Sequence, residues 1–156
     1  MIKDNLPPCL IHIDKEGRWF HKGAEIIRRE FVQFFYQHME MDIYGRCIIS
    51  WQGERCYVEV EDTPFVVWRT TFKDHQQSDP QGFILLLSND SEEMLSPETL
   101  YVGEKNVLYC EVKDHAFPAR FARSAYYQLA DFMDEEDGRY FIPLNGVKYF
   151  VRYGKN

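Results

Sequence analysis

The chain has 156 residues, of which 45% are hydrophobic and 16% aromatic, so it can bury a substantial core and disorder is not expected. A formal net charge of −7 predicts an acidic surface that repels phosphate backbones and anionic lipids, which disfavours nucleic acid or a membrane surface as partner. No apolar stretch is long enough for a signal peptide or a membrane span, and we expect a cytoplasmic protein.

The first predicted elements are a hairpin, a helix and a second hairpin. Residues 10–13 turn at Glu16-Gly17 into residues 19–21. The second hairpin, residues 45–60, turns at Gln52-Gly53, where glycine supplies the positive φ of a primed turn. Between them, helical spacing gives an apolar stripe of Ile27, Phe31, Phe34, Phe35 and His38.

A central hairpin and a second set of the same elements follow. Residues 64–73 and 81–88 are predicted to pair around the polar loop 74–80. Residues 100–102 then turn into 108–110, a helix opens with Pro118 in its first turn, and residues 138–153 form a hairpin turning at Asn145-Gly146. The predicted stripe of this second helix is Ala122, Ala125, Leu129, Phe132 and Met133.

The two sets are copies of each other. Residues 45–60 align without a gap on residues 138–153, and glycines and arginines coincide at Gly45/Gly138 and Arg46/Arg139. The helices match at an offset two residues larger, so the loop between helix and hairpin is two residues longer in the first copy. We therefore predict an α+β fold of tandem β-β-α-β-β repeats, each with antiparallel strands and one packed helix, in residues 1–62 and 99–156, linked by a β-hairpin in residues 63–98.

Several segments resemble one bacterial family, known as domain of unknown function 1285. They are Asp14-(x)2-Gly-Arg-Trp-Phe-His21, Gly23-(x)2-Ile-Ile-Arg28, Val60-Glu-Asp-Thr-Pro-Phe-Val66 and Ala119-Arg-Phe-Ala-Arg123 followed by Ala-Tyr-Tyr127. The likeness covers nearly the whole chain in the same order. It implies a duplicated α+β fold with a C-terminal half similar to pleckstrin-homology domains. For function, it implies a small, nucleotide-like ligand in the groove between the halves and a role in bacterial signal transduction.

Aromatic and basic residues provide the candidate ligand site. Trp19 and His21 alternate onto one face of a strand and could hold a planar ring, or they could form an ordinary half-buried strand face. Arg28 and Arg123 occupy equivalent helix starts, where they could clamp an anionic group, or instead bridge to local acids such as Glu25 or Glu30.

Two further residues complete the predicted site. Asp62 could cap the turn before Thr63-Pro64 or order one of the two arginines. Tyr127 could present its hydroxyl to the same groove, although a tyrosine at helical spacing more often packs in a core.

Catalytic and metal-binding patterns are absent from the sequence. We find no phosphate-binding glycine loop, nucleophile elbow or kinase signature, so we predict neither an enzyme nor a cofactor. The histidines are scattered, and the acidic run 134–137 fails the spacing of a calcium loop and is predicted to be a solvated helix end. No metal site is expected.

The cysteines Cys9, Cys47, Cys56 and Cys110 show no CxxC spacing. Because thiols keep a cytosol reduced and a zinc site needs closely paired ligands, we expect four buried, unpaired cysteines.

Three functional hypotheses follow. The first is a small-ligand-binding module that holds an anionic, nucleotide-like molecule between the repeats. The alternative is an adaptor that docks a partner protein along an exposed strand edge, with residues 64–72 as the candidate strand. A weaker third hypothesis is a hydrolase assembled around His21 and Asp62.

Overall fold

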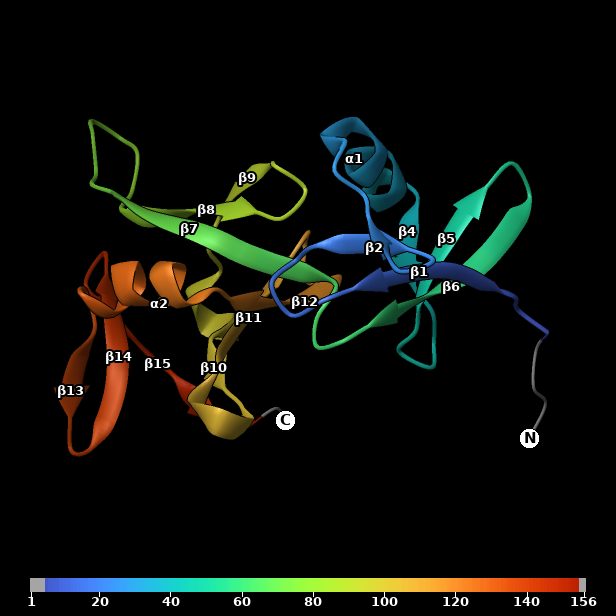
Figure 1. The fold of residues 1–156 in the computed structure, drawn as a ribbon. Coiled ribbons are helices and arrows are strands. Elements are labelled where there is room, and N and C mark those ends of the chain that lie inside the picture. Colours follow the sequence, from blue (N-terminus) through green and yellow to red (C-terminus); the bar gives the residue numbers. More distant parts are fainter. Residues whose placement is uncertain (1–4, 155–156) are drawn as a thin grey trace. The chain divides into compact units, whose positions relative to one another are not determined.

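The computed structural model describes residues 5–154 and divides into two compact units, with the division after Pro64. Figure 1 shows the helices and strands of both units.

The N-terminal unit is a six-stranded sheet with one helix (Figure 1). Its strand order is β3-β2-β1-β6-β5-β4. Neighbouring strands are antiparallel except for the first and last long strands of the unit, β1 and β6, which pair in parallel. The elements are β1 (Pro8–Ile13), β2 (Trp19–His21), β3 (Ala24–Glu25), α1 (Arg29–Gln37), β4 (Met39–Met41), β5 (Cys47–Trp51) and β6 (Glu54–Val60).

Helix α1 buries a different face from the predicted stripe. Its buried residues are Val32 and Tyr36, whereas Phe31 is 49% exposed and Ile27 lies outside the helix. Tyr36 can enter the core because its hydroxyl donates a hydrogen bond to the Pro64 carbonyl at 2.7 Å, which satisfies the polar end of an otherwise apolar ring. From residue type alone, the phenylalanines were expected to be the buried residues of this helix. The hydrogen bond of Tyr36 to a residue far along the chain allows the tyrosine to be buried.

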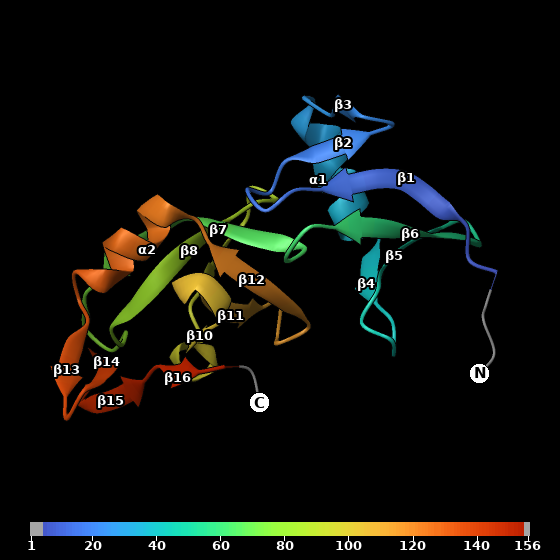
Figure 2. The ribbon, with the colours of Figure 1, turned by 60° about the horizontal axis from the view of Figure 1, so that its bottom comes forward.

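The C-terminal unit contains a seven-stranded sheet, a three-stranded sheet and helix α2. The strand orders are β16-β10-β11-β12-β7-β8-β9 and β13-β14-β15. Figure 2 shows β15 leading into β16, which pairs in parallel with β10. The elements are β7 (Phe65–Lys73), β8 (Gly82–Leu87), β9 (Glu92–Met94), the 3-10 turns η1 (Pro97–Thr99) and η2 (Glu104–Asn106), β10 (Tyr101–Val102), β11 (Leu108–Val112), β12 (Phe117–Phe121), α2 (Arg123–Ala130), β13 (Asp134–Glu136), β14 (Arg139–Leu144), β15 (Val147–Phe150) and β16 (Arg152–Tyr153).

The duplicated α+β fold is confirmed. In both copies three strands precede the helix, further strands follow it, and the first strand pairs in parallel with the last: β1 with β6, and β10 with β16. The prediction missed the short strands next to each helix, β3 and β4 in the first copy and β12 and β13 in the second. Pro118 consequently lies in β12, opposite Glu111, and not in a first helical turn, while the acidic run 134–136 forms strand β13 and not a helix end.

The central hairpin is an integral part of the second sheet. Strand β7 pairs in parallel with β12 on one side and antiparallel with β8 on the other, so residues 65–67 lie in the sheet interior. Val66 is completely buried. The predicted docking edge is therefore covered at residues 65–67, because β12 of the same chain pairs with β7 there.

Two cysteines that were expected to be unpaired form a disulfide, Cys9–Cys56. Cys9 lies on β1 and Cys56 on β6, and the parallel pairing of these two strands brings their Cα atoms to 5.0 Å. A contact between residues 47 positions apart leaves no mark on local spacing, which explains the error. Cys47 and Cys110 are buried and free, as expected.

Candidate functional site

The N-terminal unit carries a hollow of about 540 Å³ over strands β1, β2 and β6. We call it the β1–β6 hollow. It lies on the face of the sheet opposite α1: His12 and Phe20 alternate with Ile13 and Trp19, and Trp19 packs against the helix. The hollow is lined by Leu10, Ile11, His12, Asp14, Phe20, Lys22, Gly23 and Glu59.

An irregular backbone shapes one side of this hollow. The pairing of β1 with β6 shifts register between Pro8 and His12, and within the shift Leu10 adopts a φ of 63°, in the left-handed region that a leucine rarely occupies. The Leu10 carbonyl accepts a hydrogen bond from the Lys22 backbone N–H at 3.0 Å. Lys22 and Gly23 form the turn between β2 and β3, also with positive φ, so the bulge and the turn hold each other in place.

Three side chains stand in a row across the three strands. His12 is the register partner of Phe20 on one side and of Glu59 on the other, and the His12 and Phe20 rings lie 6.2 Å apart between centroids. The hollow thus offers two rings, the Lys22 ammonium group and two carboxylates, of which that of Glu59 lies in the row and that of Asp14 holds a neighbouring turn. This lining is largely apolar with a few convergent polar groups, the usual character of a small-molecule site.

Asp14 fixes the turn beside the hollow. Its Oδ1 accepts the Glu16 and Arg18 backbone N–H groups at 3.0 and 2.9 Å, and its Oδ2 accepts Arg18 Nε at 2.8 Å. Burial raises the pKa of this carboxyl, but the hydrogen bonds and charge of Arg18 outweigh it, and the pKa lies below its usual value. The Arg18 guanidinium lies 6.0 Å from the centre of the Phe20 ring and also pairs with the carboxylates of Asp14 and Glu16.

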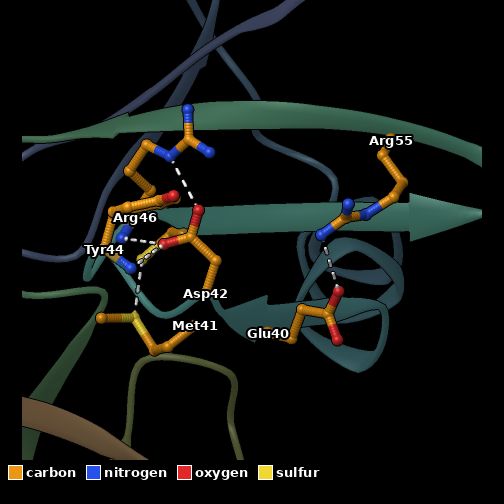
Figure 3. A network of polar contacts seen from close by, with 7 residues as sticks. Glu40, Met41, Asp42, Tyr44, Arg46 and Arg55 are labelled. Atoms are coloured by element: carbon orange, nitrogen blue, oxygen red, sulfur yellow. Dashed lines mark hydrogen bonds and ion pairs between the residues drawn. The ribbon is translucent and has the colours of Figure 1, made fainter. Parts of the chain in front are cut away.

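The same turn occurs a second time, at Asp42–Arg46. Figure 3 shows Asp42 accepting the Tyr44 and Arg46 backbone N–H groups and the Arg46 Nε, at 3.0, 2.8 and 2.7 Å. Both turns read Asp-x-x-Gly-Arg. In the first the two central residues are charged; in the second they are Ile43 and Tyr44, which are 91% and 64% exposed. At the equivalent place, the second copy of the fold has only the two-residue turn Asp137-Gly138. The two extra residues of the first copy that the alignment predicted are therefore Ile43 and Tyr44.

Among the predicted site residues, Trp19 lies in the core. It is 1% exposed, Phe35 stacks on its indole at 5.9 Å and Tyr36 meets it edge-on at 4.7 Å, so helix α1 packs against the ring. His21 shares its face, as predicted, but stands exposed at the strand end next to Lys22.

Arg28 is the residue that precedes α1. Its exposed guanidinium lies 3.7 Å from Glu30 and 5.7 Å from the centre of the Phe31 ring, so it makes the local ion pair that was considered as the alternative. Asp62 is exposed just after β6. These four predicted residues belong to the N-terminal unit, and none of them lines the hollow, although Trp19 and His21 flank Phe20 in sequence.

Arg123 and Tyr127 belong to the C-terminal unit, on α2. Arg123 is its first residue and is exposed, and Tyr127 is 58% exposed with its ring 5.4 Å from that of Tyr126. Sequence reasoning missed His12, Phe20 and Lys22. The alternation of strand residues that selected Trp19 and His21 on one face also places His12 and Phe20 on the other face. Alternation does not tell which of the two faces the helix covers.

The C-terminal unit has a smaller hollow of about 340 Å³ near the turn between β11 and β12. Four of its lining residues already pair with one another: the Glu93 carboxylate accepts the Lys113 backbone N–H at 3.1 Å, and His115 Nδ1 lies 3.0 Å from Glu111 Oε1. Across residues 5–154, no three His, Cys, Asp or Glu side chains group as metal ligands, and no helix is long and apolar enough to cross a membrane.

Two solved structures share this fold. A DUF1285 family protein from Silicibacter pomeroyi DSS-3 superimposes with a TM-score of 0.76 at 20% identity, over 95% of this chain and 80% of that one. A DUF1285 family protein from Shewanella baltica OS155 gives a TM-score of 0.63 at 16% identity, over 78% of this chain and 91% of that one. No family model and no curated protein matches the chain. The resemblance to this family seen in the sequence is confirmed as a likeness of fold.

Proposed function

We propose that this protein is a small-ligand-binding module and that the β1–β6 hollow is its binding site. The observation that carries the proposal is a hollow of about 540 Å³, within the roughly 300–1,000 Å³ typical of ligand pockets, whose lining combines apolar surface with polar side chains.

The lining suggests the chemistry of the ligand. Phe20 and His12 offer ring surfaces against which a planar molecule can pack, and Lys22 supplies a positive charge for an anionic group. Glu59 can accept hydrogen bonds from an amine or hydroxyl. A planar ring system with hydrogen-bond donors and an anionic group would use the ring surfaces, the Glu59 acceptor and the Lys22 charge together. We therefore propose a nucleotide-like ligand.

The proposed role is cytoplasmic signal transduction in a bacterium. The resemblance to DUF1285 supports this role. So does the site itself, because a ligand in the hollow would contact β1, β2, β6 and the 22–23 turn and would stabilise that arrangement over others. The C-terminal unit, expected to resemble pleckstrin-homology domains, is proposed to pass the signal on.

Thermal-shift and NMR titration with mononucleotides and cyclic nucleotides test the proposal on the oxidised protein. A ligand at 100 times its Kd should stabilise the wild type by about 2.7 kcal/mol. His12→Ala and Lys22→Asn should lose most of this gain; asparagine tolerates the positive φ of residue 22. Arg28→Ala and His115→Ala, outside the hollow, should retain it. Absence of stabilisation by every compound, or equal stabilisation of all four variants, would exclude the hollow as a nucleotide site.

The adaptor function remains a second proposal, now on the 42–46 turn. Asp42 and Arg46 make this turn stiff, and it presents Ile43 and Tyr44 to solvent, where the equivalent Asp14–Arg18 turn presents Lys15 and Glu16. The turn therefore does not need the apolar pair Ile43 and Tyr44 in order to form. A partner protein with an apolar pocket would explain why these two side chains are exposed. Replacing Ile43-Tyr44 by Lys-Glu should leave the fold intact and abolish capture of such a partner; capture that survives the swap would refute this role.

A further inference from the structure

The Cys9–Cys56 disulfide lies directly beside the β1–β6 hollow. Cys9 precedes Leu10, which lines the hollow, and Cys56 lies on β6, the strand that contributes Glu59. The disulfide therefore ties together two of the three strands that form the site. Both of its cysteines are half-buried, so a reductant can reach the bond.

The other two cysteines are unsuited to redox chemistry. Cys47 and Cys110 are buried. Burial raises the pKa of Cys47 to about 12 and raises that of Cys110 as well, so neither thiol forms the reactive thiolate at neutral pH. The thiol chemistry of residues 5–154 is thus concentrated at the edge of the hollow.

Leu10 connects the disulfide to the hollow. Its φ of 63° places the backbone in a region that costs a branched residue free energy, so something must hold it there. Three bonds do so: the disulfide at Cys9, the Tyr57 N–H to Pro7 carbonyl bond at 3.0 Å, and the Lys22 N–H to Leu10 carbonyl bond at 3.0 Å. Only the first of the three is covalent, and it responds to the redox state of the surroundings.

We propose that Cys9–Cys56 is a redox-sensitive clasp that holds Leu10 in its left-handed conformation and thereby keeps the β1–β6 hollow in shape. Two thiol groups of a reductant, either a dithiol protein or two small thiols, supply two electrons and two protons. The S–S bond breaks, Cys9 and Cys56 each become thiols, and the reductant becomes a disulfide. Leu10 then relaxes to an extended conformation, its carbonyl leaves the Lys22 N–H, and the hollow loses its wall.

This inference rests on the proposed function only for its biological meaning, and its test needs no ligand. Backbone amide spectra of the full chain are recorded before and after dithiothreitol, with alkylation and mass spectrometry to verify reduction of Cys9 and Cys56. Reduction should shift the amide signals of Leu10, His12 and Lys22, while those of Ala125 and Leu129 in the other unit stay in place.

Leu10→Gly is the matched variant. Glycine adopts a positive φ without cost, so in this variant the bulge should persist after reduction and the signals of residues 12 and 22 should barely move. Unchanged wild-type signals, equal changes in wild type and Leu10→Gly, or unfolding of the N-terminal unit in both on reduction would each overturn the proposal; the last result would make the bond a structural staple.

If the nucleotide screen yields a ligand, a second measurement follows. Reduction should weaken binding to the wild type by roughly tenfold, because without the disulfide only a fraction of the molecules would keep Leu10 in its strained conformation. Binding to Leu10→Gly should be unchanged. If the screen yields none, the proposed ligand fails while the spectra still decide whether the clasp operates.

Discussion

Gln81 and Asn145 are joined by three hydrogen bonds. The Gln81 N–H donates to Asn145 Oδ1 at 2.8 Å, the Asn145 N–H donates to Gln81 Oε1 at 3.1 Å, and Asn145 Nδ2 donates to the Gln81 carbonyl at 3.0 Å. Asn145 is also the first residue of the β14–β15 turn, with a φ of 52°. One residue therefore forms a hairpin turn and attaches the three-stranded sheet to the base of β8.

Asn145→Gly separates these two roles. Glycine keeps the turn but loses the bonds that the amide makes to Gln81, and we expect the free energy of unfolding to fall by about 1–2 kcal/mol in urea titrations. The duplication offers a control: Gln52 holds the same position in the β5–β6 turn, with a φ of 51°. Gln52→Gly should change stability by less than about 0.5 kcal/mol. Equal losses in the two variants would mean that the turn, and not the attachment, is what the asparagine supplies.

Two buried threonines predict opposite outcomes for the same substitution. Thr99 Oγ1 donates to the Ser96 carbonyl at 2.7 Å and accepts the Glu111 N–H at 3.0 Å, whereas Thr70 Oγ1 is buried and has no hydrogen-bond partner among residues 5–154. Thr99→Val should destabilise by about 1–3 kcal/mol, and Thr70→Val should be neutral or stabilise by up to about 1 kcal/mol. Thermal and urea unfolding of the two variants test this prediction. A clear loss of stability in Thr70→Val would contradict the burial of a hydroxyl without a hydrogen bond.

The disulfide predicts a large contribution to stability. By the chain-entropy model, closing a loop between residues 47 positions apart is worth about 4 kcal/mol. Cys9→Ser with Cys56→Ser should lower the free energy of unfolding of the N-terminal unit by this order, followed through the fluorescence of the buried Trp19. Dithiothreitol should produce the same loss in the wild type and none in the double variant. A double variant as stable as the oxidised wild type would show that the bond contributes nothing to stability.

The turns held by Asp14 and Asp42 predict a pH dependence. The hydrogen bonds and charges of Arg18 and Arg46 lower both carboxyl pKa values below 3.8, although burial alone would raise them. A carboxyl whose folded pKa is depressed stabilises the fold fully above its unfolded pKa, and this contribution is lost as pH falls through the folded value.

Urea titrations of Asp14→Asn and Asp42→Asn should therefore show a stability gap to the wild type that is present at pH 6 and shrinks below about pH 3.8. A gap that is the same at pH 6 and pH 2.5 would show that the carboxylate charge plays no part in holding these turns.

For the functional site, the sequence determined which residues share a face and not which face is covered. Strand alternation correctly placed Trp19 with His21. Helix α1 then covered that face with Phe35 and Tyr36, and the opposite face with His12 and Phe20 became the wall of a hollow. A period of two is symmetric between the faces of a strand, so only the packing of a distant helix can distinguish them.

The sequence by itself determined the local elements and their repetition. Gln52-Gly53 and Asn145-Gly146 form hairpin turns because their backbones take the positive φ that a two-residue turn demands, a requirement met within the turn itself. Tertiary structure alone decided the parallel pairing of β1 with β6, the Cys9–Cys56 bond and the interior place of β7. Each joins strands that are far apart in the chain, and the free energy that selects them comes from burial and pairing of whole strands, which no local pattern of residues encodes.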